Sequence, residues 1–282
     1  MLRGQSHFAG ILGWPLEHTL SPPIHNAAFR RIGLDWIYLA FPVPPENLGA
    51  AVAGLRALGC TGANVTMPHK EAVVGLLDQV SGDAASVGAV NTIQLVGDAL
   101  IGHNTDIDGF RNFLTDDAGL DVAGRAAVIL GAGGAARAVV RALDDLGAAR
   151  LTVAVRAVER GEALAALAGA ASLEVVEWKD AEAAVESADV VVNATPLGMR
   201  GERLLEGARW HEGQCAVDLV YHPHVTPFLR QAGAQGAQTW GGLGMLIHQA
   251  AASFRIWTGQ DPPLEAMSAA AVRQLATHSE GP

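Results

Sequence analysis

A short apolar strand that runs into a glycine-rich turn and then a helix is the feature that most constrains this chain. Residues 127–130 are aliphatic, residues 131–136 read GAGGAA, and a helical pattern follows as far as Leu146. The spacing matches GxGxxA, in which glycines allow a tight turn and bring backbone N–H groups close to a pyrophosphate at the helix N-terminus. In this context the pattern predicts a dinucleotide site with backbone contacts from Gly131, Ala132, Gly133, Gly134 and Ala135.

Apolar runs with strand character alternate with amphipathic stretches along most of the chain, which predicts an α/β protein with mainly parallel sheets. In the first part we expect strands near residues 7–14, 36–41 and 62–66, then a hairpin over 89–104 that turns at Gly97 and Asp98. The helices between them are expected from Ser21, as the capping residue before Pro22, to Gly33, and over residues 45–58. A further helix is expected to begin at Lys70.

Five more strands are expected near residues 126–131, 151–155, 173–178, 189–194 and 215–220, and these form a second sheet. Helices over 241–257 and 262–277 have no strand after them, so we expect them to return to the first domain. The 282 residues suggest about two domains. We therefore predict two α/β domains, an N-terminal one formed by residues 1–106 plus 242–282 and a Rossmann-type one formed by residues 107–241.

Composition excludes several classes of function. A net charge of -10 without a run of Lys or Arg disfavours binding to nucleic acid or to an anionic membrane surface. No uninterrupted apolar run reaches the length of about 18 residues that a membrane span needs. The two cysteines, Cys60 and Cys215, lie far apart, and the sequence has no HExxH, so we predict no disulfide framework, no metal site and a cytoplasmic location.

Two arginines follow the second strand of the predicted dinucleotide-binding domain. An NAD-binding protein offers Asp or Glu to the ribose hydroxyls about 20 residues after the fingerprint begins. This chain has Arg156 there, with Arg160 one helical turn later. Because guanidinium groups bind phosphate oxygens in a bidentate manner, the pair favours the 2′-phosphate of NADP(H). The alternative is that both arginines are solvated residues of a helix.

Only two of the 19 basic residues are lysines, Lys70 and Lys179. Lys70 closes the polar string Asn-Val-Thr-Met-Pro-His-Lys over residues 64–70. A lysine can release and regain a proton where an arginine stays charged, so Lys70 is a candidate for acid/base chemistry. The alternative is a solvated surface lysine, which is how we interpret Lys179.

Several polar strings resemble, in their order and spacing, those of the shikimate dehydrogenase family. They are HTLS at 18–21, NVTMPHK at 64–70, GAVNT at 88–92, GHNTD at 102–106, NATPLGM at 193–199, DLVY at 218–221 and GLGMLIHQ at 242–249. The resemblance covers almost the whole chain. It implies a substrate domain and an NADP domain, and reversible NADPH-dependent reduction of 3-dehydroshikimate to shikimate in the shikimate pathway of aromatic amino acid biosynthesis.

The resemblance also implies roles for particular residues. Lys70 and Asp106 become the catalytic pair that faces the reacting oxygen, where an ammonium can donate a proton as hydride reaches the carbonyl carbon. Substrate contacts are implied for Thr19, Ser21, Asn64, Thr66, Lys70, Asn91, Asp106, Tyr221 and Gln249. Besides the glycine turn and the two arginines, cofactor contacts are implied for Asn193, Thr195, Leu219 and Gly242.

The chain departs from the family pattern at two places. The family's HSxS has Thr19 at its first serine, and the usual NRT after the second cofactor strand reads Val155, Arg156, Ala157. The first change adds a methyl group at the carboxylate contact, and the second removes two polar groups beside the cofactor. Two alternatives therefore stay open: a quinate/shikimate dehydrogenase with relaxed cofactor use, and a protein that binds NADP(H) without catalysis. We expect a small-molecule substrate as the partner, and a monomer or homodimer as the assembly.

Overall fold

A computed structural model describes residues 6–279 and divides the chain into two compact units. Unit 1 contains the described residues up to Gly109 and from Ile247 onward, and unit 2 is Phe110–Leu246. Both connections between the units are helical: α4 (Asp106–Asn112) and α9 (Leu243–Thr258) each begin in one unit and end in the other.

Unit 1 contains a mixed sheet of six strands. The strands are β1 (His7–Gly13), β2 (Trp36–Pro42), β3 (Gly62–Val65), β4 (Gln79–Val80), β5 (Thr92–Val96) and β6 (Ala99–His103), in the order β2-β1-β3-β5-β6-β4. Strand β1 pairs in parallel with β2 and β3, β4 pairs in parallel with β6, and the predicted hairpin β5–β6 is antiparallel. Strand β5 is also antiparallel to β3, so the sheet is mainly but not wholly parallel.

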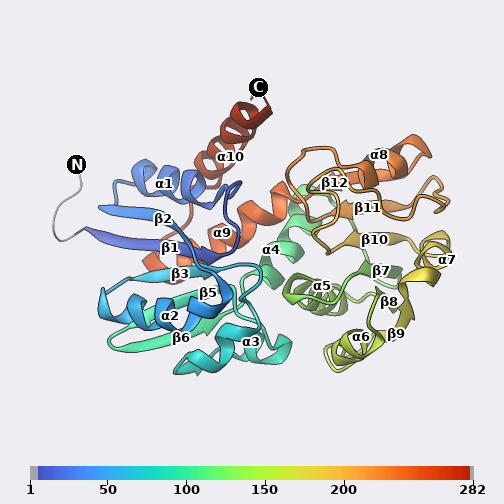
Figure 1. Cartoon of the computed structure of the whole chain (residues 1–282). Helices are drawn as coiled ribbons and strands as arrows, with labels where there is room; N and C mark the ends of the chain where they lie inside the picture. Colours follow the sequence, from blue (N-terminus) through green and yellow to red (C-terminus); the bar gives the residue numbers. More distant parts are fainter. Residues whose placement is uncertain (1–5, 280–282) are drawn as a thin grey trace. The chain divides into compact units, whose positions relative to one another are not determined.

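Helices cover both faces of this sheet (Figure 1). One face packs against α2 (Leu48–Ala57) and, beyond it, η2 (Ala72–Leu76) and α3 (Gly82–Val87), in a core that includes Leu12, Val52 and Val65. The other face packs against α1 (Ser21–Arg31) and α9, and α10 (Leu264–Ser279) lies along α1. Gly62 of β3 permits the close approach of α9, because a Cβ there would come within 2.2 Å of the Trp257 indole.

Unit 2 contains a second sheet of six strands, all parallel. The strands are β7 (Ala126–Leu130), β8 (Arg150–Val155), β9 (Ser172–Glu177), β10 (Val190–Asn193), β11 (Cys215–Asp218) and β12 (Gln238–Gly241). Their order is β12-β11-β10-β7-β8-β9. Counted within the unit this is the 3-2-1-4-5-6 order of a Rossmann fold, which confirms the predicted fold class.

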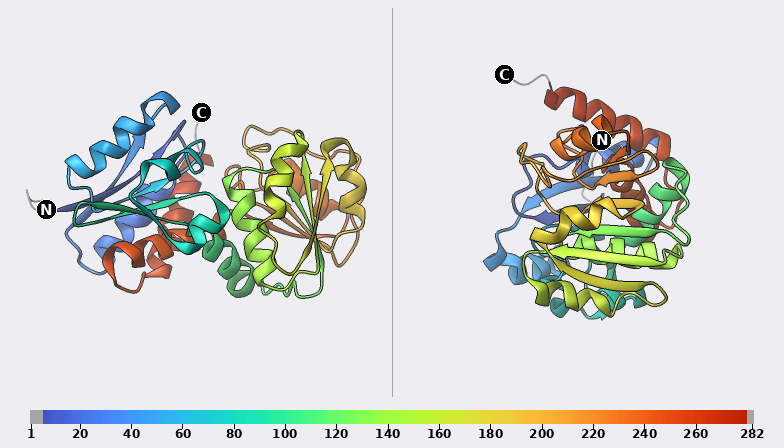
Figure 2. Two further views of the ribbon diagram at one scale, coloured as in Figure 1. Left: turned by 90° about the horizontal axis from the view of Figure 1, so that it is seen from below. Right: turned by 90° about the vertical axis from the view of Figure 1, so that its right-hand side faces the viewer.

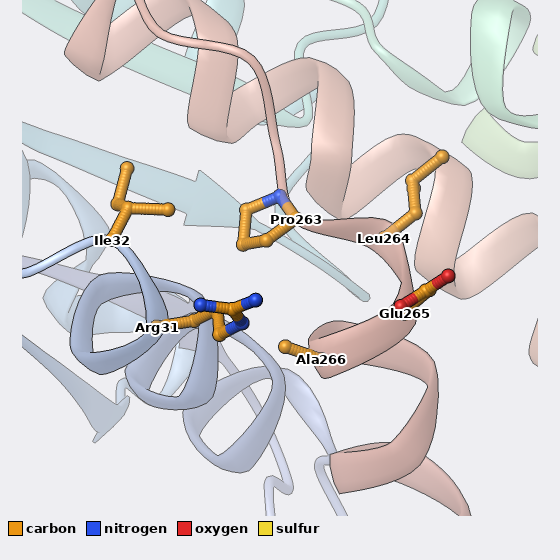
Figure 3. A pocket seen from close by; sticks show the side chains of 6 residues that line it. All are labelled: Arg31, Ile32, Pro263, Leu264, Glu265 and Ala266. Carbon is orange, nitrogen blue, oxygen red and sulfur yellow. The ribbon is translucent and has the colours of Figure 1, made fainter.

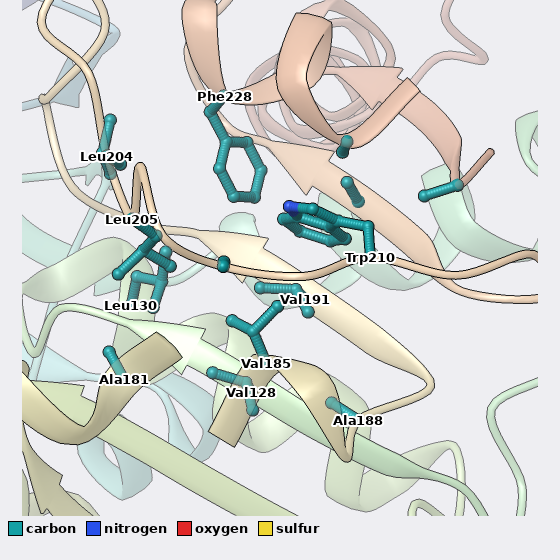
Figure 4. Close-up of a cluster of buried hydrophobic side chains, with 14 of the residues drawn as sticks. Val128, Leu130, Ala181, Val185, Ala188, Val191, Leu204, Leu205, Trp210 and Phe228 are labelled. Atoms are coloured by element: carbon teal, nitrogen blue, oxygen red, sulfur yellow. The ribbon is translucent and has the colours of Figure 1, made fainter. Parts of the chain in front are cut away.

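Helices also lie on both faces of the second sheet (Figure 2). Strand residues such as Val128 and Val191 pack against α7 (Ala181–Glu186) and α8 (Pro227–Ala234), around Trp210 and Phe228 (Figure 4). Alternate strand residues face the opposite way, toward α5 (Gly134–Asp145) and α6 (Val158–Ala165). Gly161 lets α6 approach that face, since a Cβ there would lie 2.4 Å from Val175.

Most of the elements predicted from sequence agree with the structure, but the helices α3 and α4 were not predicted. Strands β4 and β12 were not predicted, because β4 has two residues and β12 has an exposed edge sequence, Gln-Thr-Trp-Gly. Helix α1 is capped at Leu20, so Ser21 is its first residue and not its cap. The segment over 45–58 is split into the 3₁₀ helix η1 (Pro45–Asn47) and α2. The helix expected from Lys70 is only the short 3₁₀ helix η2, and the chain contains further short helices at η3 (Phe113–Asp117, a π-helix) and η4 (Trp178–Asp180).

The α1 and α9 side of unit 1 holds an aromatic cluster with a histidine at its centre. The His25 ring stacks on Tyr38 at a centroid distance of 4.4 Å and an interplanar angle of 12°, and the Trp257 ring lies 5.2 Å away. His25 is fully buried, and neither ring nitrogen has a hydrogen-bond partner among the residues that the structure describes. Burial lowers the pKa of His25 to about 3, because a charged imidazolium loses its hydration there.

We expect His25 to make the protein less stable in acid. Between pH 3 and pH 6.5 the His25 imidazole binds a proton in the unfolded chain but not in the folded chain. The free energy of unfolding therefore rises with pH in this window, and the contribution of His25 is lost as the pH falls from 6.5 to about 3. The expected slope is about 1.4 kcal/mol per pH unit. Urea denaturation from pH 5 to pH 7 of the wild type and of His25→Phe measures it, and equal slopes in the two proteins would contradict this account.

Candidate active site

The predicted site residues fall into two groups, one in each unit. In unit 1 the strand directions explain why the first group lies at one sheet edge. Strands β1 and β3 end there, β5 begins there, and β6 returns there, since Asn64 is paired with Thr92 and Thr92 with His103. The segments that leave this edge carry Thr19 and Ser21 after β1, Thr66 and Lys70 after β3, Asn91 before β5, and Asp106 after β6.

Lys70 and Asp106 form an ion pair at this edge. The Lys70 Nζ donates to Asp106 Oδ2 over 2.6 Å, and the exposed fractions of the two side chains are 15% and 5%. The other oxygen, Oδ1, accepts a hydrogen bond of 2.8 Å from Asn91 Nδ2. Both carboxylate oxygens are therefore held, and the ammonium keeps donors that are free to meet a ligand.

Asn104 fixes the backbone on which Asp106 stands. Its Oδ1 accepts from the backbone N–H groups of Asp106 and Ile107, and its Nδ2 donates to the Ala89 carbonyl. The first turn of α4 is thereby capped by a side chain that is itself bound to the neighbouring segment. This places the Asp106 carboxylate with a defined orientation before any ligand binds.

The loop that carries Lys70 is anchored at several points. The backbone of Thr66 donates to the Leu12 carbonyl, and the Val90 N–H donates to the Lys70 carbonyl. The buried His69 ring shares a hydrogen bond of 2.7 Å with the Val43 carbonyl. Thr66 itself is half-buried, and its methyl group lies against Gly13, where a Cβ would come within 2.3 Å.

A buried polar network lies behind the ion pair. Asn64 Oδ1 accepts a hydrogen bond of 2.7 Å from the Tyr38 hydroxyl, and Asn64 Nδ2 reaches Ser253 Oγ at 2.9 Å and Thr92 Oγ1 at 3.1 Å. Ser253 Oγ also lies 3.1 Å from Thr105 Oγ1 and donates to the Gln249 carbonyl over 3.0 Å. The polar atoms of the Asn64 side chain are thus all bonded to protein atoms.

The remaining predicted residues of unit 1 lie around the same edge. Gln249, on α9, accepts a long hydrogen bond of 3.4 Å from Asn91 Nδ2 through its Oε1. Gly109 allows this approach, since a Cβ there would lie 2.6 Å from the Gln249 Cβ. Thr19 Oγ1 accepts from the Ser21 backbone N–H at 3.4 Å, so the two hydroxyl residues sit together at the start of α1.

In unit 2 the glycine turn joins the end of β7 to the start of α5, at the point where the strand order reverses. Gly131 has φ of +103°, and a Cβ there would lie 2.9 Å from the Thr195 methyl group. A Cβ on Gly133, the capping residue of α5, would meet nothing within 4 Å. Helix α5 has no side-chain cap and no acidic residue in its first turn, so its N-terminal N–H groups fit a pyrophosphate.

The other predicted cofactor residues lie at the carboxyl ends of the neighbouring strands. Asn193 Oδ1 accepts from the Thr195 backbone N–H and hydroxyl, at 3.1 and 2.7 Å. Gly242 approaches Leu219 so closely that a Cβ would lie 2.2 Å from the Leu219 carbonyl oxygen. Tyr221 follows β11 on the same side, half-buried.

Arg156 and Arg160 follow β8 and are both exposed; Arg156 lies in the turn before α6, and Arg160 lies in the first turn of that helix. Their exposure agrees with the prediction that they meet a ligand from solvent. It agrees equally with the alternative of solvated helix residues, so the assignment stays a prediction.

Six residues with evident positioning roles were not among the predicted site residues: Tyr38, Thr92, Asn104, Thr105, Ser253 and Asp218. Ser253 had a signal, since it lies one helical turn after Gln249 on an otherwise apolar helix face. Four of them lie within the polar sequence segments that carried the resemblance: Thr92, Asn104, Thr105 and Asp218. The sequence contains no signal for the role of Tyr38, because the residues around it are those of an ordinary buried β-strand.

A surface pocket lies elsewhere, between the end of α1 and the start of α10 (Figure 3). It is lined by Arg31, Ile32, Pro263, Leu264, Glu265 and Ala266. None of these is a predicted site residue. Among the residues described, no helix is both long and apolar enough to cross a membrane.

The fold and the glycine turn define an α/β protein of the dinucleotide-binding class, with a second α/β unit that carries a lysine–aspartate pair. Family models match three stretches: "Shikimate dehydrogenase substrate binding domain" at residues 11–93, "Shikimate / quinate 5-dehydrogenase" at 114–200 and "Shikimate 5'-dehydrogenase C-terminal domain" at 242–272. The shikimate dehydrogenase (NADP(+)) of Methanothermobacter thermautotrophicus is 45% identical over 282 residues, covering 98% of this chain and 99% of the relative.

Solved structures agree with these matches. A shikimate dehydrogenase in complex with NADP+ superposes with a TM-score of 0.88 at 37% identity, over 98% of each chain. The Thermus thermophilus shikimate 5-dehydrogenase in complex with NADP(H) and shikimate has a TM-score of 0.83 at 38% identity, over 95% of this chain and 99% of the other. The chain belongs to the shikimate dehydrogenase family, as the polar strings predicted.

The network behind the ion pair should contribute measurably to stability. Ser253→Ala removes a hydroxyl that contacts Asn64, Thr92 and Thr105, and leaves buried polar groups with one partner fewer. We expect a loss of about 1–3 kcal/mol in the free energy of unfolding, measured by urea denaturation. Ser187→Ala is the matched control, because that exposed hydroxyl makes a single bond to the Ala184 carbonyl. Equal stability of the two variants would contradict a role for the network.

Proposed function

We propose that this chain is an NADP-dependent shikimate dehydrogenase, which reversibly reduces the ring ketone of 3-dehydroshikimate to the hydroxyl of shikimate. The observation that carries the proposal is the Lys70–Asp106 pair, 2.6 Å apart and almost buried, at a sheet edge lined with neutral polar side chains. Membership of the family supports the same reaction. The place of the reaction is the biosynthesis of chorismate and aromatic amino acids.

Lys70 is the proton donor in ketone reduction. As the carbonyl carbon gains a hydride, negative charge develops on the oxygen, and an ammonium at hydrogen-bond distance transfers a proton to it. The proton leaves Lys70 Nζ and forms the new O–H bond, and the amine is then reprotonated from solvent. In the reverse direction the neutral amine accepts the hydroxyl proton. Asp106 orients Lys70 through Oδ2 and offers its carboxylate to the same substrate oxygen or its neighbour.

Substrate hydroxyls are recognised by Thr66, Asn91, Asp106 and Gln249, which share the edge of unit 1. Each polar group left unpaired on burial costs about 1–3 kcal/mol, so a ring with hydroxyls in the right places is preferred over one without them. The carboxylate of the substrate is bound by the Thr19 and Ser21 hydroxyls. Tyr221 stays a proposed substrate contact. Asn64 stays a proposed substrate contact, although its present partners are protein atoms.

The cofactor is NADP(H), whose nicotinamide supplies the hydride. Unit 2 fits this cofactor, because a Cβ at the Gly133 capping position would meet nothing within 4 Å and α5 has neither a side-chain cap nor an acidic residue in its first turn. Gly131, Ala132, Gly133, Gly134 and Ala135 approach the pyrophosphate, and Arg156 and Arg160 bind the 2′-phosphate. Asn193 and Thr195 lie toward the ribose, and Leu219 and Gly242 toward the nicotinamide.

The same proposal assigns roles to the two parts of the chain. Residues 1–106 plus 242–282 bind substrate and carry the catalytic pair, and residues 107–241 bind the dinucleotide. We also propose a cytoplasmic location, which the two buried free cysteines support, and a monomer or homodimer as the assembly.

The direct test is a spectrophotometric assay of cofactor oxidation with 3-dehydroshikimate, repeated with NADH and, in the oxidative direction, with shikimate and quinate. Turnover with NADPH and shikimate but little with NADH or quinate supports the proposal. Comparable turnover of quinate would favour the quinate/shikimate alternative. Binding of NADPH without turnover of either acid would favour the non-catalytic alternative.

We expect Lys70→Ala to lower kcat by about 100-fold or more, because general acid catalysis typically contributes that much. The Kd for NADPH should stay within twofold of wild type, as measured by quenching of intrinsic fluorescence. Lys179→Ala is the control, since Lys179 is an exposed lysine of unit 2 whose Nζ lies 3.0 Å from Glu177 Oε2 on the surface. An unchanged kcat in Lys70→Ala would remove Lys70 from the mechanism.

We expect Arg156→Ala to weaken the preference for NADPH over NADH. A charged hydrogen bond to phosphate contributes about 1.5–3 kcal/mol, which corresponds to a rise of roughly 10- to 100-fold in the KM for NADPH. The KM for NADH should hardly move. Arg150→Ala, at the opposite end of the same strand, is the matched control. A parallel change in both KM values would mean that Arg156 does not bind the 2′-phosphate.

A further inference from the structure

Unit 2 contains a buried carboxylate that the proposed mechanism does not use. Asp218 ends β11 and has no exposed surface. Its Oδ1 accepts from Asn193 Nδ2 at 2.9 Å and from the Val220 backbone N–H at 3.0 Å, and its Oδ2 accepts from the Thr226 hydroxyl at 2.6 Å. The three donors are all neutral, and each comes from a different segment of the chain.

These three segments meet at the carboxyl edge of the sheet, where ligands bind in open α/β sheets. Asn193 ends β10 and holds Thr195 through its other amide atom, Oδ1. Val220 lies between Leu219 and Tyr221, and its carbonyl accepts from the Gly242 N–H at 3.3 Å. Thr226 caps α8 by accepting from the Leu229 N–H. One carboxylate thus joins the loops that carry Thr195, Leu219, Tyr221 and Gly242.

A buried carboxylate at position 218 lowers the stability of the fold unless it has a further role. Burial raises the pKa of its carboxyl to about 6, against the opposing effect of its hydrogen bonds to Thr226, Val220 and Asn193. The ionised form is therefore disfavoured by its surroundings, and a neutral amide of the same shape would avoid that penalty. Residues that are costly for stability but fix a ligand-binding edge are typical of functional positions.

We propose that Asp218 is a positioning residue for the cofactor: by receiving three donors at once, it fixes the loops after β10 and β11 in the conformation that receives the ribose and nicotinamide of NADP(H). The inference rests on the proposed function for the identity of the cofactor. Asp218 contacts neither cofactor nor substrate in this account. It acts through Asn193, Val220 and Thr226.

The test compares Asp218→Asn with Asp189→Asn. Asp189 precedes β10 at the opposite edge of the same sheet, where its Oδ2 accepts from the Ala126 N–H at 2.8 Å. In Asp218→Asn an amide N–H₂ replaces an acceptor and meets the Thr226 hydroxyl or the Asn193 amide. We expect kcat/KM for NADPH to fall by about 10- to 100-fold through misplacement of the loops, while the melting temperature stays at or above that of wild type. Asp189→Asn should keep kcat/KM within twofold.

A second pair of variants keeps the test decisive if Asp218→Asn fails to fold. Thr226→Ser retains the hydroxyl that donates to Asp218 and should keep wild-type kcat/KM. Thr226→Val removes it and should reproduce the loss. Unchanged kcat/KM in both Asp218→Asn and Thr226→Val, or a lowered melting temperature with unchanged kcat/KM, would overturn the inference.

Binding measurements separate this inference from the proposed function. The Kd for NADPH, measured by quenching of intrinsic fluorescence, should rise in Asp218→Asn and Thr226→Val but not in Thr226→Ser. Failure of the wild type to reduce 3-dehydroshikimate would overturn the proposed function alone, because the Kd series would still test Asp218. Normal turnover of the wild type with an unchanged Kd and kcat/KM in the variants would overturn the inference alone.

Discussion

An ion pair held almost out of water, between Lys70 and Asp106, is the interaction on which the rest of unit 1 depends. Removing two charges from water costs several kcal/mol per ion, and their attraction offsets this only when the remaining polar atoms are also satisfied. The surroundings meet that demand: Asn91 holds the second carboxylate oxygen, and Asn104 caps the turn on which Asp106 stands. Thr92 and Thr105, which belong to the buried network with Asn64 and Ser253, hydrogen-bond to Asn91 in turn, so the ion pair is supported by neutral hydrogen bonds and not by further charges.

The two sheets collect functional residues for the same topological reason. In the parallel sheet of unit 2 every strand ends at the same edge. The glycine turn, Asn193, Asp218 and Gly242 therefore lie at that edge as a direct result of the topology. In unit 1 the antiparallel hairpin also brings functional residues to one edge of the sheet, because β5 begins beside the end of β3 and β6 ends beside the start of β5. Residues separated by dozens of positions in the chain, such as Lys70, Asn91 and Asp106, therefore become neighbours.

Sequence reasoning predicted what depends on local pattern. The glycine turn, the alternation of strands and helices and the hairpin at Gly97 follow from periodicity and turn chemistry, and the fold class was confirmed. Strand β12 was not predicted, because its polar edge sequence lacks an apolar run. The prediction of a helix from Lys70 was wrong, because only a short 3₁₀ helix forms before Leu77. The roles of Tyr38, Ser253 and Asp218 depend on partners brought together by tertiary folding, as in the 189 positions between Asn64 and Ser253, and no local pattern contains that information.

The most direct test of the central claim is a double-mutant cycle on turnover with Lys70→Met, Asp106→Asn and the double variant. If Lys70 and Asp106 act as one unit on the same substrate oxygen, the second substitution should add little to the loss caused by the first, and the coupling free energy should exceed about 1 kcal/mol. Additive losses, with each substitution lowering kcat by its full factor in the absence of the other residue, would contradict the account.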